Sequence, residues 1–338
     1  MKKTILFLGV VALATLGCKD EIESPAIAES TSSVGSHVAS DAWQRKADMT
    51  IGRAEAVAFS IANKGYIGTG MTSSGSFRTL SDFWEYNPNT DVWTQKADVG
   101  DAPRRRAVGF SLSGKGYIGT GYAGSVTSGS PSDDFWQYTP ETNTWEEKAA
   151  VPGGGRAGAV GFAIASRGYI GTGSPSDFEY LKDFYEYDPG TDSWERRADF
   201  EGRARSGAVG FTIASRGYLG TGVTTDSTGN VFLRDFWKYT PSSDQWIKVA
   251  SIPVRMTAGV AFSISNLGFV GTGGSGNGEE EFYRYNPVSD TWAQIADFVG
   301  GERVSAVAFS IGPRGYVGTG FNPSANPEDQ KDLWAYRP

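Results

Sequence analysis

The sequence is poor in the residues that most often carry catalysis and metal binding. Its 338 residues contain one histidine, His37, and one cysteine, Cys18. A lone cysteine cannot form an intramolecular disulfide. Because no histidine follows His37, the rest of the chain cannot build a Ser-His or Cys-His nucleophile pair or a histidine-ligated metal site. We therefore expect no catalytic residue of this kind, no metal site and no cofactor.

An excess of positive charge and long apolar segments are also missing. The formal net charge is −7, which is not typical of a nucleic-acid-binding protein. The apolar stretch from Ile5 to Leu16 is shorter than the roughly 20 residues that span a bilayer as a helix. Glycine is abundant, with 45 residues, and aromatic residues make up 13%. Together with the absence of a long helical periodicity, this composition favours an all-β fold with many tight turns.

The first residues of the chain predict export and attachment to a lipid. Lys2 and Lys3 form a basic region before the apolar stretch, and Gly17 directly precedes Cys18. This arrangement resembles the lipobox of bacterial lipoproteins, in which the signal peptide is cut before a cysteine that becomes acylated. Thr15 stands where that motif usually has leucine. The alternative is an ordinary secretory signal with an unrelated cysteine.

Composition divides the chain into three parts. Residues 1–17 form the expected signal peptide, and residues 18–40 form the lipidated cysteine and a flexible tether rich in Ser, Ala and Glu. Residues 41–338 form the folded domain. The Lys-Asp-Glu run at 19–21 resembles the surface-export signal of some Gram-negative lipoproteins. We expect an exported monomer at the periplasmic or the outer face of the outer membrane, with the lipid as its only membrane contact.

Six copies of one unit make up the folded domain. The tripeptide Gly-Thr-Gly recurs at intervals of about 50 residues. It begins at Gly68, Gly119, Gly171, Gly220, Gly271 and Gly318. An apolar run precedes each copy, and an acidic residue with an aromatic run, such as DFWEY at 82–86, follows it. Each unit is therefore four short strands, here named a to d. Such a unit cannot bury both of its faces alone, so the repeats predict the packed blades of a β-propeller.

The aromatic residues of the unit resemble the kelch repeat, in which six residues separate a Tyr from a Trp. This spacing holds in Tyr86/Trp93, Tyr138/Trp145, Tyr187/Trp194, Tyr239/Trp246 and Tyr285/Trp292. Gly-Thr-Gly stands where kelch repeats have a Gly-Gly pair. The resemblance implies a six-bladed kelch-type β-propeller over residues 41–338, with these aromatic residues packed between blades.

The last copy is incomplete. It ends at Pro338, before its Trp, and the missing piece lies at the other end of the domain. There WQRKAD at 43–48 matches WTQKAD at 93–98. We expect this N-terminal strand to become strand d of the last blade, which removes the open edge that a three-stranded blade would expose.

The order of the strands separates two faces. In an antiparallel blade the d–a and b–c connections lie on one face, and the a–b and c–d turns lie on the other. The b–c segments are long and differ in every copy, whereas the a–b and c–d turns are short and similar. Variable loops on a rigid scaffold usually carry binding, so we expect the d–a/b–c face to be functional.

Arginines concentrate on this face. Five of them stand six residues before the phenylalanine of strand a: Arg53, Arg104, Arg156, Arg205 and Arg303. We expect them to surround the mouth of the axial channel and, with the additional Arg105, Arg106 and Arg203, to bind an anion. The alternative is structural, because a carboxylate opens each strand c, as Asp134 does, and the two groups could pair within the blade. Blade five has Met256 at the arginine position.

Aromatic residues outside the repeat pattern also lie in the b–c segments. Tyr122, Phe178 and Tyr180 stand among Ser, Gly and acidic residues. Exposed rings in such surroundings suit the apolar face of a sugar or a protein partner. The alternative is that they fold back over the ends of the blades.

These observations favour a non-catalytic binding module of the cell envelope that holds a glycan or a protein. The alternative is a carbohydrate-active enzyme, because paired carboxylates can hydrolyse glycosides and kelch-type propellers include sialic acid mutarotases. Glu55 and the cluster at 279–281 are its candidate acids. Kelch-type copper oxidases use histidine ligands, which residues 41–338 lack.

Overall fold

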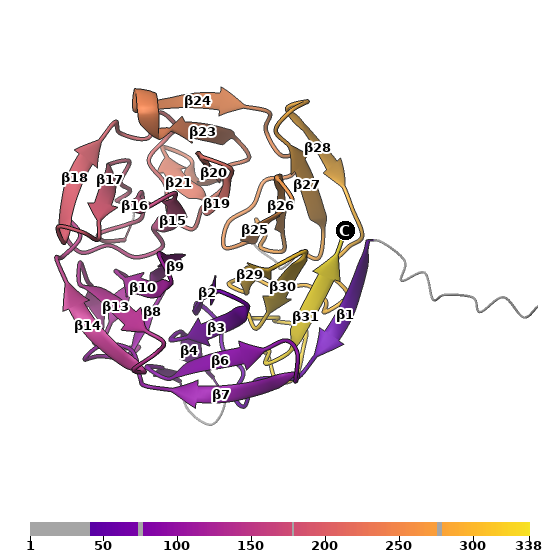
Figure 1. The fold of residues 1–338 in the computed structure, drawn as a ribbon. Coiled ribbons are helices and arrows are strands. Elements are labelled where there is room, and N and C mark those ends of the chain that lie inside the picture. The colour runs from indigo at the N-terminus through magenta and orange to yellow at the C-terminus, as the bar shows by residue number, and fades with distance from the viewer. Residues whose placement is uncertain (1–40, 74–76, 178, 276–278) are drawn as a thin grey trace, which may run out of the picture. The chain divides into compact units, whose positions relative to one another are not determined.

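The computed structural model describes residues 41–338, except residues 74–76, 178 and 276–278. In this part of the chain, six four-stranded antiparallel sheets surround a central axis (Figure 1). The predicted all-β, six-bladed kelch-type β-propeller is confirmed. The described residues include no helix with the length and apolar character needed to span a bilayer. The predicted signal peptide, Cys18 and the tether lie outside the described residues.

Each sheet runs from an inner strand a to an outer strand d. Strand a is β2 (Val57–Ile61), β9 (Val108–Leu112), β15 (Val160–Ile164), β19 (Val209–Ile213), β25 (Val260–Ile264) and β29 (Val307–Ile311). Strand b is β3 (Lys64–Gly68), β10 (Lys115–Gly119), β16 (Arg167–Gly171), β20 (Arg216–Gly220), β26 (Leu267–Gly271) and β30 (Arg314–Gly318). Strand c is β6 (Phe83–Asn87), β13 (Phe135–Thr139), β17 (Phe184–Asp188), β23 (Phe236–Thr240), β27 (Phe282–Asn286) and β31 (Leu333–Arg337). Strand d is β7 (Val92–Lys96), β14 (Thr144–Lys148), β18 (Ser193–Arg197), β24 (Gln245–Val249), β28 (Thr291–Gln294) and β1 (Ala42–Lys46).

The connections add a few short elements. On the d–a/b–c face these are β4 (Met71–Thr72), β5 (Arg78–Thr79), β8 (Arg104–Arg105), β11 (Tyr122–Ala123), β12 (Ser130–Pro131), β21 (Val223–Asp226) and β22 (Gly229–Phe232). The c–d turn of blade four contains a 3-10 helix, η1 (Pro241–Ser243).

The inner strands follow the two-residue period of a strand. In β2, Val57, Phe59 and Ile61 are buried, while the small side chains between them face the axis. The ring of Phe59 lies against Gly116 of the next blade, where an added Cβ would be 2.6 Å from ring atom Cε2. The other blades repeat this contact. The glycine at the second position of each strand b therefore makes room for the phenylalanine of its neighbour.

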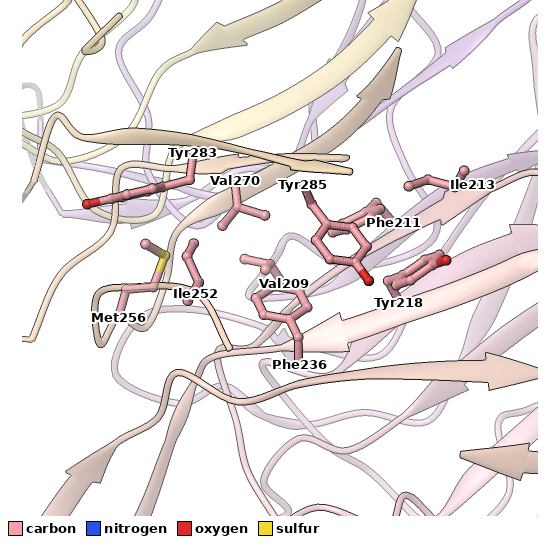
Figure 2. Packing of buried hydrophobic residues seen from close by; sticks show 10 residues of the cluster. All are labelled: Val209, Phe211, Ile213, Tyr218, Phe236, Ile252, Met256, Val270, Tyr283 and Tyr285. Carbon is pink, nitrogen blue, oxygen red and sulfur yellow. The ribbon is translucent and has the colours of Figure 1, made fainter. Parts of the chain in front are cut away.

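The hydrophobic cores lie between blades. Figure 2 shows the cluster between blades four and five, in which Phe211 and Tyr218 of blade four pack with Tyr285 of blade five. The rings of Tyr218 and Tyr285 meet edge to face, with 5.5 Å between their centroids. Each blade thus buries its apolar faces only against its neighbours, as the repeat pattern predicts.

The outer strands are joined by a repeated polar contact. Trp93 of blade one donates a hydrogen bond from Nε1 to the carbonyl of Ala47, at 2.9 Å. The carboxylate of Asp91, in the preceding turn, accepts from the backbone N–H of Ala47 and from the hydroxyl of Tyr86. Equivalent tryptophans donate to Ala97, Ala149, Ala198, Ala250 and Ala296. The alanine that follows strand d therefore accepts a hydrogen bond from the tryptophan of the neighbouring blade at every seam, the contact between the outer strands of two blades.

The last blade is completed by the N-terminal strand, as predicted. β1 pairs with β31 so that Trp43 lies opposite Tyr336. Asp41 accepts a hydrogen bond from the hydroxyl of Tyr336 and so takes the place of the turn residue Asp91. The ring of Trp43 packs on Phe282 and Phe298 of blade five, at 5.1 and 4.9 Å. One short strand thus completes a blade and joins it to the neighbour.

We predict that Trp43→Ala lowers the free energy of unfolding by about 2–4 kcal/mol, because it removes the ring that packs on Phe282 and Phe298. Urea unfolding measures the change. Gln44→Ala, an exposed position in the same strand, is the matched control, with an expected change within about 0.5 kcal/mol. Equal stability of both variants would contradict the role of β1 in closure.

Candidate functional site at the channel mouth

A closed ring of backbone hydrogen bonds surrounds the channel on the d–a/b–c face. One residue per blade takes part: Glu55, Arg106, Gly158, Gly207, Ala258 and Ser305. Each backbone N–H donates to the carbonyl of the corresponding residue in the preceding blade, over 2.8 to 3.1 Å, and the N–H of Glu55 closes the ring onto Ser305. All six residues have a positive φ, between 53° and 63°. This left-handed geometry is uncommon for residues other than glycine, and here it turns each peptide toward the next blade.

The side chains on this ring are distributed unevenly. Charged groups come from blades one and two, with Glu55 and Arg106, whereas Gly158 and Gly207 leave blades three and four open. A cavity of about 360 Å³ lies over the ring. Its wall also includes Val223 and Thr257. The mouth is therefore charged on one side and open on the other.

The charged side contains one carboxylate and two guanidinium groups. Arg105 Nη1 lies 2.8 Å from Glu55 Oε2, and Arg106 Nε lies 4.0 Å from Glu55 Oε1. The Arg105 and Glu55 side chains are each 21% exposed, and the Arg106 side chain is 35% exposed. Arg106 makes one further, long hydrogen bond of 3.4 Å to Ser206 Oγ. Arg105 is thus closely paired, while much of the Arg106 guanidinium remains accessible from the mouth.

Two of the predicted aromatic residues lie beside these charges. The guanidinium of Arg105 lies over the ring of Tyr122, 4.8 Å from its centroid. Tyr180 is half-buried, and burial raises the pKa of its hydroxyl, against the lowering effect of the charge on Arg106. Phe178 lies outside the described residues. Tyr122 and Tyr180 are therefore neither fully exposed nor part of a blade core.

The five repeated arginines are placed differently from the prediction. Each guanidinium is fully buried inside its blade instead of lining the channel mouth. Each one binds the carboxylate that opens strand c through two nitrogen atoms, as Arg53 does with Asp82 at 2.8 and 2.7 Å. The other pairs are Arg104 with Asp134, Arg156 with Asp183, Arg205 with Asp235, and Arg303 with Asp332. This geometry favours the structural alternative, because a buried and doubly bound guanidinium has no surface to offer a ligand.

These pairs also perturb the acids. Burial alone would raise the pKa values of Asp82, Asp134 and Asp235. The hydrogen bonds and charge of the partner arginines outweigh burial and hold all three pKa values below the usual range for aspartate. These carboxylates are therefore ionised partners at neutral pH and do not serve as proton donors.

The remaining candidates lie apart from the mouth cavity. Arg203 is exposed and donates a hydrogen bond to the carbonyl of Thr225 in β21, at 3.2 Å. Glu279 and its acidic neighbours lie at the blade-five side of the same face. Partial burial and the nearby charges of Glu281 and Glu302 raise the pKa of Glu279. Neither group lines the cavity over the ring.

Sequence reasoning missed the polar residues that support the open side of the mouth. Ser206 is buried, and its hydroxyl lies 3.3 Å from the carbonyl of Ala157. The hydroxyl of Thr257 donates to the carbonyl of Gly207, at 3.2 Å. Both residues stand one place before a ring residue, where the other blades have Ala54, Arg105, Ala157 and Val304. In the sequence, the signal that could have identified these two residues was the variation at this one position of the repeat.

The arrangement can bind an anion and offers one carboxylate close to it. An accessible guanidinium can hold a carboxylate or phosphate through two parallel hydrogen bonds. Glu55 could accept a proton from a bound ligand. Within the described ranges, no group of three His, Cys, Asp or Glu residues is placed to hold a metal ion.

Comparisons with known proteins agree with the propeller fold. No family model matches the chain. Over 92 residues the chain is 33% identical to N-acetylneuraminate epimerase of Yersinia enterocolitica, a match that covers 26% of this chain and 22% of that enzyme. The chain thus matches about a fifth of the length of this curated relative. The solved structure of YjhT superposes with a TM-score of 0.72 at 15% identity, over 85% of this chain and 95% of YjhT. At this identity the structural likeness concerns the fold.

We predict that Arg104→Met destabilises the protein by about 3–5 kcal/mol, because it leaves the Asp134 carboxylate without its partner. Arg104→Met/Asp134→Asn should recover part of this loss, since no unpaired charge remains. Thermal and urea unfolding measure both. Arg203→Met is the matched control on an exposed arginine, with an expected change below about 0.5 kcal/mol. An unchanged stability of Arg104→Met would show that the buried pair is dispensable.

Proposed function

We propose that the channel mouth binds a sugar that carries a carboxylate. The observation that carries this proposal is Arg106, a partly exposed guanidinium in the wall of a cavity. Among the described residues, its partners are a carboxylate 4.0 Å away and one long hydrogen bond. A planar guanidinium with free N–H groups matches the two oxygen atoms of a carboxylate. The carboxylate of the ligand would be the close anionic partner that Arg106 lacks among the described residues.

The rest of the mouth suits a small polar ligand. Its volume of about 360 Å³ falls within the range of roughly 300–1,000 Å³ that is common for small-molecule sites. Gly158 and Gly207 leave space beside Arg106, and Ser305 and Thr257 are among the residues of the wall. Tyr180 does not line this cavity, but the charge of Arg106 acts on its hydroxyl, and its half-buried ring is a surface on which the apolar face of a sugar can stack.

The comparisons support a sugar as the ligand, in preference to a protein partner. The curated relative is named as acting on N-acetylneuraminate, which is itself a carboxylated sugar. Because the match covers only 22% of that enzyme, the ligand class is a proposal for this chain.

A second candidate function is the interconversion of the two anomers of such a sugar, which the name of the same relative favours. Glu55 would accept the proton of the anomeric hydroxyl while the bond between the anomeric carbon and the ring oxygen breaks. Tyr180, which like other tyrosines is protonated at neutral pH, would donate a proton to the ring oxygen. The ring hydroxyl would then attack the opposite face of the carbonyl, returning its proton to Tyr180 while Glu55 returns its proton to the new anomeric hydroxyl. Binding at Arg106 does not require this chemistry.

We predict saturable binding of N-acetylneuraminate to the full chain by titration calorimetry. Arg106→Gln should weaken it about tenfold or more, the effect of losing one charged hydrogen-bonded contact. Arg203→Gln is the matched control and should leave the affinity unchanged. Anomeric exchange followed by NMR tests the second function: acceleration that Glu55→Gln abolishes supports an enzyme, and binding without acceleration supports a binding module. Absence of saturable binding, or equal weakening by Arg203→Gln, would contradict the proposal.

We also propose that the protein acts at the cell envelope, anchored by lipid on Cys18, as the lipobox-like sequence implies. Labelled fatty acid should be incorporated into the wild-type chain and not into Cys18→Ala, and the variant should move to the soluble fraction. Equal behaviour of the two chains would indicate simple secretion.

A further inference from the structure

A second cavity lies between blades three and four, at the opposite end of the inner strands from the channel mouth. Its volume is about 510 Å³. It lies beside the a–b turns that follow β15 and β19, whereas the mouth lies at the start of these strands. Its polar wall consists of Arg167, Tyr169, Glu186 and Arg197 from blade three, and of Ser215, Arg216 and Ser242 from blade four. None of these residues takes part in the site proposed above.

On the blade-three side, the charges neutralise one another. Glu186 is buried, and it accepts hydrogen bonds from the hydroxyl of Tyr169 at 2.7 Å and from Arg197 Nε at 3.0 Å. Arg167 Nε lies 3.4 Å from the same carboxylate, and Arg167 Nη2 lies 2.8 Å from Asp188. This wall is therefore a saturated network that holds its arginines in place.

On the blade-four side, Arg216 has no such partner. Its Nη1 donates to the carbonyl and the hydroxyl of the adjacent Ser215, both at 3.0 Å. None of the carboxylates among the described residues lies within ion-pair distance of Arg216. The reason lies in the repeat: the strand-c position that holds Glu85 in blade one and Glu186 in blade three holds Lys238 in blade four. Substitution of an acid by a second cation thus leaves a half-buried guanidinium uncompensated in the wall of a cavity.

We propose that this cavity is a second ligand site, which binds the oxyanion group of a small molecule on Arg216. A carboxylate, phosphate or sulfate would receive hydrogen bonds from Arg216 Nε and Nη2. The hydroxyls of Ser215 and Ser242 are further donors in the same wall. The blade-three network is charge-balanced and adds no unpaired acid that would repel the ligand.

The chain contains a matched control for charge alone. Arg314 occupies the same position of strand b in blade six, where Ala335 replaces the glutamate, so it also lacks an ion pair among the described residues. Arg314 does not line the cavity between blades three and four. If general surface charge attracted the anion, Arg314 and Arg216 would contribute equally.

The test uses the full chain carrying Arg106→Gln, which weakens binding at the channel mouth. Inorganic phosphate, sulfate and N-acetylneuraminate are each titrated at constant ionic strength by calorimetry. We expect saturable binding of at least one of them, weakened about tenfold by Arg216→Gln and unchanged by Arg314→Gln. Tighter binding of the sugar than of phosphate and sulfate would assign the site to a carboxylated ligand, and the reverse order would assign it to an inorganic or phosphorylated one.

Three outcomes would overturn the proposal: no saturable binding of any of the three anions, no effect of Arg216→Gln, or equal weakening by Arg314→Gln. Arg216→Lys keeps the charge but loses the planar pair of donors, and should bind with intermediate affinity. Melting temperatures of all variants confirm that the fold is intact. Because every chain in this experiment carries Arg106→Gln, any binding that remains at the channel mouth is the same in all of them, and the difference between Arg216→Gln and Arg314→Gln reports on the second cavity.

Discussion

The structure depends on a buried guanidinium that recurs in five of the six blades. It joins three segments that are distant in the sequence: the connection before strand a, the Gly-Thr-Gly tripeptide that ends strand b, and the acid that opens strand c. In blade one, Arg53 Nη1 donates to the carbonyl of Thr69 and to the carboxylate of Asp82, and the N–H of Thr69 donates to the carbonyl of Asp82. The threonine has a positive φ of 61° in this arrangement. The arginine before strand a, the Gly-Thr-Gly tripeptide and the acid of strand c therefore all contribute to the same set of contacts.

This arginine clamp, the contact of the buried arginine with the strand-c acid and the Gly-Thr-Gly carbonyl, also explains how the channel mouth is held. The ring residue Glu55 stands two places after Arg53, and Arg106 stands two places after Arg104, so each clamp fixes the chain just before it enters the ring. The backbone ring then frees its side chains from any structural task. Blades can place a carboxylate, a guanidinium, a hydroxyl or no side chain at these positions without changing the fold. Rigid clamps below variable ring positions are a physical basis for changing ligand preference within one architecture.

Both proposed sites arise where individual blades depart from the repeat. At the mouth, Glu55 and Arg106 stand where the other blades have glycine, alanine or serine. In the second cavity, Lys238 stands where blades one and three have glutamate, which leaves Arg216 without a carboxylate. Blade five shows that a departure can also be structural: Met256 replaces the clamp arginine and packs in a hydrophobic cluster, and Glu281 accepts a hydrogen bond from Tyr283 instead.

Much of the fold could be predicted from the sequence, because the repeated motifs mark where each blade begins and ends. The spacing of Gly-Thr-Gly and of the Tyr and Trp pairs determined six four-stranded blades, and the unmatched WQRKAD segment determined the closure through Trp43. The sequence could not decide where the repeated arginines point, since a residue at the start of an inner strand can face the axis or its own blade. Packing decided this: a carboxylate lies within the blade and binds the guanidinium of Arg53 through two nitrogen atoms. The pairing of Glu55 with Arg105, and the lack of a carboxylate partner for Arg216 among the described residues, likewise depend on distances that only the folded structure sets.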